Sequence, residues 1–136
     1  MQVVSTVISR SVEACWSVFT DPTKLTSWVP GLRDARVIEL GDEGLPREVQ
    51  FEFAATLAYS LIYSYDVVAR MVTWDPRDGD KGGVRGFASF ANTEGGTQFT
   101  YALEHDDARK AAERAIDNPR TLAEAFARLM HESPLG

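Results

Sequence analysis

The sequence predicts one α+β domain over residues 1–136, in which a curved antiparallel sheet of six to seven strands wraps around a long C-terminal helix. The patterns along the chain run in the order strand, two short helices, about six strands and one terminal helix. Short turns separate the strands, which makes consecutive strands antiparallel neighbours. A chain of 136 residues also suits a single hydrophobic core.

The composition excludes several classes of protein. The formal net charge is −6 and the acidic residues are spread along the chain, so no basic stripe exists that could bind a nucleic acid. Cys15 is the only cysteine, which excludes an intramolecular disulfide and a thiolate metal cluster. With two histidines, a multi-histidine metal site is excluded as well, so we expect no metal and no cofactor.

The N-terminal residues 1–16 alternate apolar with polar side chains and contain no basic leader. No segment approaches the ~20 apolar residues that span a bilayer. The single cysteine fits a reducing compartment. We therefore expect a soluble, cytoplasmic protein without a membrane span, either a monomer or a homodimer.

The first elements are predicted from β-branched residues and helix caps. Residues 2–9 form a β-branched run typical of a strand. Ser11 is a suitable N-cap for a short helix, and Asp21-Pro22 repeats this start signal for a second helix that ends near Trp28. Pro30-Gly31 then forces a turn. The first helix has one apolar stripe, formed by Val12, Cys15, Trp16 and Phe19.

The middle of the chain reads as strands separated by turn residues. The alternation is clearest in the second of these strands, where Val49, Phe51 and Phe53 share a face that we assign to the core. Tyrosines at positions 59, 63 and 65 share one face of the next strand with Leu61. The predicted strands cover residues 35–40, 47–56, 59–69, 71–74, 84–92 and 97–105.

The tail, residues 106–133, is helical in composition, but Asp117-Asn118-Pro119 predicts a kink or two abutting helices. Its second half carries Leu122, Phe126 and Met130 on one face, whereas its first half offers almost only alanine. Small side chains opposite an aromatic sheet leave an apolar void that can receive a ligand. The alternative is that alanine, the best helix former, simply lets the helix approach the sheet or covers a solvated surface.

Two motifs resemble a known superfamily. The segment SVEACWSVFTDPTKLTSWVPGL and the later GGTQFTYALEHD resemble the START-like, or SRPBCC, superfamily, which includes polyketide cyclases, lipid-transfer proteins and the birch-pollen-allergen group. The resemblance implies a helix-grip fold with a ligand pocket, and Asn118-Pro119 departs from its usual unbroken terminal helix. The matching positions are Trp16, Asp21, Pro22, Leu25, Trp28, Pro30, Gly31, Gly96 and Thr97.

The predicted ligand-binding residues are those that an aromatic sheet face and the terminal helix would present to such a pocket. Trp74 is a candidate for the pocket mouth, beside the glycine-rich turn at residues 79–83. We assign Trp16 and Trp28 to packing. The full set is Phe51, Phe53, Tyr59, Leu61, Tyr63, Tyr65, Trp74, Phe87, Ala108, Ala111, Ala112, Ala115 and Phe126.

Three functions remain open at this point. The first is binding or carriage of a hydrophobic small molecule such as a lipid, isoprenoid or polyketide. The second is a polyketide cyclase or dehydratase, in which Tyr63 and Arg85 would polarise a carbonyl and Glu52 would move a proton. The third is an interaction domain, because some relatives of this fold stimulate a chaperone ATPase through their outer surface.

Overall fold

The computed structural model describes residues 1–41, 43–53, 58–77, 84–105 and 118–132. Across these residues the strands form one seven-stranded antiparallel sheet in the order β1-β7-β6-β5-β4-β3-β2, which confirms the predicted α+β class. The strands are β1 (Gln2–Ile8), β2 (Leu32–Leu40), β3 (Pro46–Phe53), β4 (Ala58–Asp66), β5 (Met71–Pro76), β6 (Val84–Thr93) and β7 (Gly96–His105).

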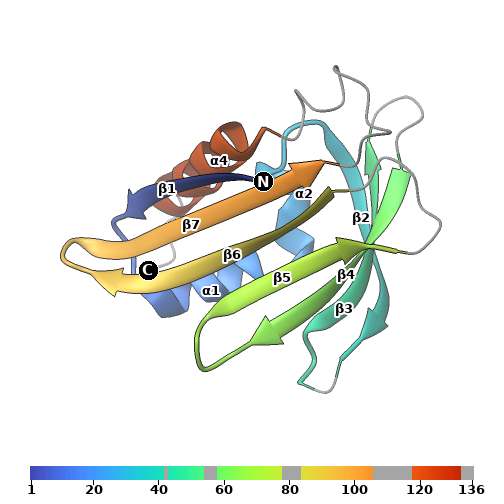
Figure 1. Cartoon of the computed structure of the whole chain (residues 1–136), viewed down its shortest axis with the longest axis horizontal. Helices are drawn as coiled ribbons and strands as arrows, with labels where there is room; N and C mark the ends of the chain where they lie inside the picture. Colours follow the sequence, from blue (N-terminus) through green and yellow to red (C-terminus); the bar gives the residue numbers. More distant parts are fainter. Residues whose placement is uncertain (42, 54–57, 78–83, 106–117, 133–136) are drawn as a thin grey trace.

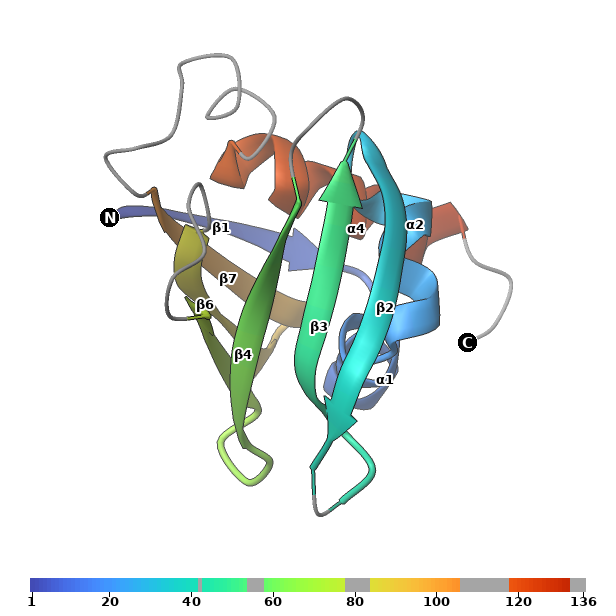
Figure 2. The same cartoon turned by 90° about the vertical axis from the view of Figure 1, so that its right-hand side faces the viewer.

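The sheet is strongly bent, and the helices lie on its concave side. Figure 1 shows α1 (Val12–Phe19), α2 (Leu25–Trp28) and α4 (Pro119–Glu132) on the same side of the strands. Figure 2 shows β2, β3 and β4 standing across the direction of β1, β6 and β7. Helix α4 packs on β1 and β7, α1 packs on β6 and β7, and α2 contacts both β2 and α4. None of the described helices is long and apolar enough to cross a membrane.

The helix starts follow the caps that the sequence predicts. The Ser11 hydroxyl accepts the Ala14 backbone N–H at 3.1 Å. Asp21 Oδ1 accepts the backbone N–H of Thr23 at 2.9 Å, and this cap begins a 3₁₀ turn, η1 (Pro22–Lys24), that leads directly into α2. The chain then leaves the helix at Gly31, whose φ of 77° is easily reached without a Cβ.

The terminal helix begins where the sequence predicts a break. Asn118 Oδ1 accepts the backbone N–H groups of Arg120 and Thr121 at 3.0 and 3.3 Å, so Asn118 is the N-cap of α4. Pro119 at the first helical position needs no donor. Leu122 and Phe126 lie on the buried face of the helix. The alanine-rich first half of the predicted tail, with Ala108, Ala111, Ala112 and Ala115, lies outside the described residues.

The far end of α4 is tied to the end of β1. The backbone N–H of Ser9 donates to His131 Nε2 at 3.0 Å. Arg10 Nη1 donates to the Met130 carbonyl at 2.5 Å, which satisfies one of the carbonyls that a helix leaves free at its C-terminus. Met130 itself is fully buried. These contacts fix α4 over one edge of the sheet.

The start of β2 and the end of β4 each differ from the prediction by three residues. β2 starts at Leu32 rather than at residue 35, because its pairing with β3 begins opposite Phe53. β4 ends at Asp66 rather than at residue 69, because the Asp66 carboxylate accepts the Ala69 N–H at 3.0 Å and starts a turn. Arg70 completes that turn with a φ of 55°.

Candidate functional site

An apolar cavity of about 50 Å³ lies between the sheet and the segment that runs from the end of α1 through α2. A buried water needs roughly 10–15 Å³ on the same scale, so the space holds a few waters or one small ring. Strands β3, β4 and β5 supply most of the sheet wall. The cavity therefore lies where the concave face extends beyond α4, which packs on β1 and β7.

Most of the sheet residues that the sequence predicts to bind a ligand lie in this wall. Strand alternation turns every second side chain of β3 and β4 to the concave side. Rings stack there between neighbouring strands, with Phe51 and Tyr59 centroids 5.9 Å apart, and along β4, with Tyr63 and Tyr65 centroids 6.1 Å apart. The nominated residues in the wall are Phe51, Phe53, Tyr59, Leu61, Tyr63, Tyr65 and Trp74.

Trp74 depends on a glycine for its position. A Cβ on Gly86, in the neighbouring strand β6, would lie 2.0 Å from the Ala102 carbonyl oxygen and 3.0 Å from Trp74 Cζ2. The close approach of the indole to the β6 backbone therefore requires glycine there. Trp74 is buried, and its ring centroid lies 6.0 Å from that of Tyr63 and 5.5 Å from that of Tyr101.

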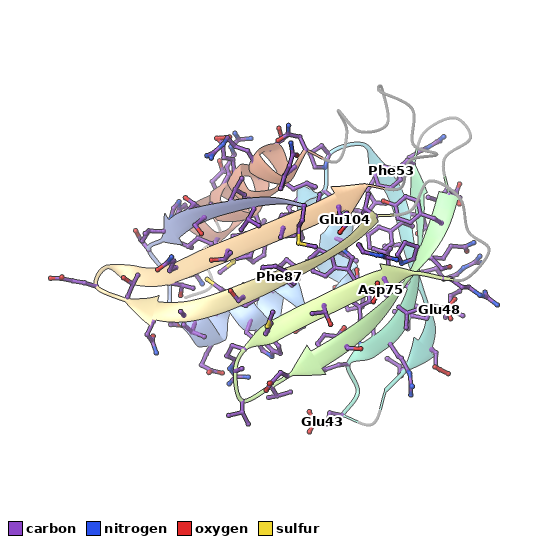
Figure 3. The ribbon with its side chains drawn as sticks, viewed as in Figure 1. Glu43, Glu48, Phe53, Asp75, Phe87 and Glu104 are labelled. Atoms are coloured by element: carbon purple, nitrogen blue, oxygen red, sulfur yellow. The ribbon has the colours of Figure 1, made fainter. Side chains whose placement is uncertain are left out.

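Three nominated residues lie on the opposite face of the sheet, which corrects the prediction. Glu52 is exposed because it alternates with the inward Phe51 and Phe53. Arg85 is exposed and forms an ion pair with Asp75 at 3.3 Å. Phe87 is two residues after Arg85 in β6 and therefore lies on the same face, which Figure 3 shows to be the face away from the helices. Glu52 and Arg85 are thus separated by the sheet from Tyr63, so the three predicted catalytic groups do not converge.

Phe126 is also not part of the cavity wall. It is fully buried under α4, with its ring centroid 5.0 Å from that of Phe99 and 5.2 Å from that of Trp28. The helix α4 instead contributes Leu122 to the wall. Phe126 therefore packs against the wall residue Trp28 on the side away from the cavity.

The sequence reasoning missed the side of the cavity opposite the sheet. Trp28 was assigned to packing, yet its side chain lines the cavity. A four-residue helix is too short to show a periodic apolar face, so the Asp-Pro start and the Pro-Gly turn marked a helix here but not which of its side chains face the sheet. The missed wall residues of this segment are Phe19, Thr20, Pro22, Leu25, Trp28 and Val29.

The described residues of the wall include no charged side chain. Its polar groups are mainly tyrosine hydroxyls. Burial raises the pKa of Tyr63 well above its ordinary value, and neighbouring tyrosines add to this shift. Burial likewise raises the pKa of Tyr65. Both phenols therefore stay protonated at neutral pH and can donate hydrogen bonds.

Tyr65 also closes a gap in the sheet. The β3–β4 ladder stops at the pair Glu48 and Ile62, although β4 continues along β5 to Asp66. The Tyr65 hydroxyl spans the unpaired stretch and donates to the Pro46 carbonyl at 2.6 Å. Tyr63 and Tyr65 line both the cavity and a groove on the outside of this gap, so they form the partition between the two.

A family model described as polyketide cyclase / dehydrase and lipid transport matches residues 2–133. This match confirms the resemblance that the two sequence motifs carry. No curated protein sequence matches the chain at a significant level.

Solved structures match along nearly the whole chain at low sequence identity. A START superfamily protein from Mycobacterium smegmatis has a TM-score of 0.75 at 12% identity, over 96% of this chain and 97% of that one. A STAR-related lipid transfer protein from Xanthomonas axonopodis has a TM-score of 0.69 at 12% identity, over 96% and 85%. The di-domain ARO/CYC StfQ of the steffimycin biosynthetic pathway has a TM-score of 0.68 at 12% identity, over 96% and 44%. These matches establish the helix-grip fold.

Proposed function

Because this chain belongs to the polyketide cyclase/dehydrase and lipid transport family, we propose that it binds a neutral, apolar small molecule in the cavity against β3, β4 and β5. The guest would be of lipid, isoprenoid or polyketide type. The observation that carries the proposal is the wall itself, which is aromatic and aliphatic and has no charged side chain among its described residues. A charged guest would lose its hydration there without gaining a counter-ion.

The size of the cavity limits the guest in this conformation to one ring or the end of a chain. A larger guest requires side chains of the wall to move. This movement is easiest at the partition formed by Tyr63 and Tyr65. Among the described contacts, one hydrogen bond, from Tyr65 to Pro46, spans the unpaired stretch between β3 and β4.

Carriage is favoured over catalysis. A cyclase needs a base or acid beside the reacting carbon, and Glu52 and Arg85 lie across the sheet from the cavity. Tyr63 can orient a carbonyl but has no described charged partner in the wall that would move a proton. We place the binding in the cytoplasm, in line with the single cysteine.

The first test is whether a guest is bound at all. Native mass spectrometry of the purified protein would show any guest that co-purifies. Cumene, a neutral one-ring hydrocarbon, should shift backbone amide signals of β3, β4 and β5 in NMR titrations. An absence of both a co-purified guest and cumene shifts would overturn the proposal.

A matched pair of variants locates the site. Val49→Phe adds a ring to a residue of the wall and should weaken cumene binding at least about tenfold, since the guest and the new ring need the same space. Val7→Phe makes the same change at an exposed position of β1 and should leave binding unchanged. Equal binding by both variants would place the guest elsewhere.

A further inference from the structure

The indole N–H of Trp28 is a buried donor without a hydrogen-bond acceptor in the part of the chain that the structure describes. Trp28 is only 5% exposed, and its side chain belongs to the cavity wall. The aromatic rings of Phe19, Tyr101 and Phe126 surround it at centroid distances of 5.6, 6.4 and 5.2 Å. The donor is therefore held in an apolar setting.

Such a group is uncommon, because the large majority of buried polar atoms in folded proteins have a partner. Leaving one unpaired costs stability, and phenylalanine would fill a similar aromatic position without this penalty. Trp28 lines the cavity, and its unpaired N–H is itself closed off from open space in this conformation, so it gains a partner if a guest displaces a neighbouring side chain and brings an acceptor. The unpaired N–H would then make the protein selective, because a guest with an acceptor removes the cost of the unpaired donor and a guest without one does not.

We propose that Trp28 is a specificity-determining residue, whose N–H binds a neutral oxygen acceptor of the guest, such as a ketone or ether oxygen. This inference rests on the proposed function and narrows its guest class. The oxygen is neutral because no described residue of the wall is charged, so a carboxylate would lack a counter-ion. The guest is an apolar molecule with at least one carbonyl-like acceptor at the α2 side of the cavity.

Acetophenone and cumene separate the oxygen from the shape of the guest. Their sizes and outlines are alike, but only acetophenone carries an acceptor. After correction for their different partition from water into hydrocarbon, acetophenone should bind about tenfold more tightly to the natural protein, the effect of one buried hydrogen bond. Benzoate, which has the charged form of the acceptor, should bind more weakly than acetophenone.

The indole resonance reports the contact directly in the natural protein. The protein has three tryptophans, and hence three indole N–H signals. Acetophenone should move the Trp28 signal downfield, as expected for a new N–H···O bond, while cumene should not. Signal assignment follows from Trp28→Phe, or from Trp16→Phe and Trp74→Phe if Trp28→Phe does not fold.

Trp28→Phe keeps the ring and removes the donor, so the tenfold preference for acetophenone should fall to about one. Trp16→Phe is the matched control, since Trp16 is buried but is not a described part of the wall, and it should keep the preference. If both probes bind with no preference and the Trp28 signal stays in place, the inference is overturned while the proposed function stands. If neither probe binds, the proposed function itself fails.

Discussion

The concave face has two regions that are filled differently. In the packed region, formed by β1, β6 and β7 under α1 and α4, Phe99 and Phe126 are fully buried with centroids 5.0 Å apart. In the cavity region, formed by β3, β4 and β5 opposite α2, stacked rings leave about 50 Å³ open. The same sheet thus closes a core at one end and keeps space at the other.

The residue types explain the difference. The rings at the centre of the packed region are phenylalanines, such as Phe90, Phe99 and Phe126, which need no polar partner. The cavity region has tyrosines in β4, and a buried hydroxyl needs an acceptor or a wet cavity. Tyr65 finds the Pro46 carbonyl. Tyrosine on the inner face of a strand therefore marks the part of this fold where a guest or water can reach.

The largest expected effect comes from removing a ring in the packed region. Phe126→Ala should lower the free energy of unfolding by about 4 kcal/mol, because surrounding rings on several elements cannot collapse into the space. Phe51→Ala in the cavity region should cost less, about 2–3 kcal/mol, since its side chain already borders open space. Urea denaturation of both variants gives the comparison, and equal costs would mean that the two regions are packed alike.

Much of the fold could be predicted because its signals are local. Ser11, Asp21 and Asn118 cap the helices through side-chain bonds to nearby backbone, and the alternation of β3 depends only on neighbouring residues. The same alternation should have excluded Glu52 from the site. It lies between Phe51 and Phe53, and adjacent strand residues cannot face the same cavity.

The parts that could not be predicted depend on contacts between distant segments. Both faces of β6 carry a phenylalanine, so this strand alone does not decide between them, and the prediction took the face of Phe87. The structure reverses this choice, because the Trp74 ring from β5 fills the space above Gly86. The contribution of Trp28 likewise follows from tertiary packing.

A pair of enlarged residues compares the two regions at directly opposed positions. Val72 on β5 pairs with Ala88 on β6, but only Val72 lines the cavity. Ala88→Val should cost about 1–3 kcal/mol, because it adds volume to a filled site. Val72→Leu should stay within about 0.5 kcal/mol of the natural protein, since its added methylene has space to enter. A similar loss in both variants would argue against open space beside Val72.

The tyrosines of the cavity region predict a loss of stability in alkali. An unfolded tyrosine ionises near pH 10. Burial raises the pKa of Tyr63, so above pH 10 the folded state binds more protons than the unfolded state, and stability falls as pH rises. Tyr63→Phe should reduce this slope by up to about 1.4 kcal/mol per pH unit. Denaturation between pH 9 and 11.5 measures it, and an unchanged slope would mean that Tyr63 ionises freely.

The thiol of Cys15, in the packed region, also contributes to the loss of stability in alkali. Burial also raises the pKa of the Cys15 thiol in the packed region, and an unfolded thiol ionises near pH 8.5. Stability lost through Cys15 therefore begins at a lower pH than the loss through Tyr63. The natural protein and Tyr63→Phe are best compared in a Cys15→Ala background, which removes the contribution of this thiol to the alkaline slope.

The smallest effect compares one hydrogen bond from each region. His131→Ala removes the bond from Ser9 to α4, and Tyr65→Phe removes the bond to Pro46, so each should lower stability by about 1 kcal/mol. Their effects on guest exchange should differ. The Tyr65 bond spans the partition between cavity and groove, so its loss should speed the dissociation of acetophenone severalfold in NMR exchange measurements. His131 lies at the other end of α4 and should leave the rate unchanged. Equal rates in both variants would show that the guest leaves by another path, and that the gap between β3 and β4 is closed by more than this one bond.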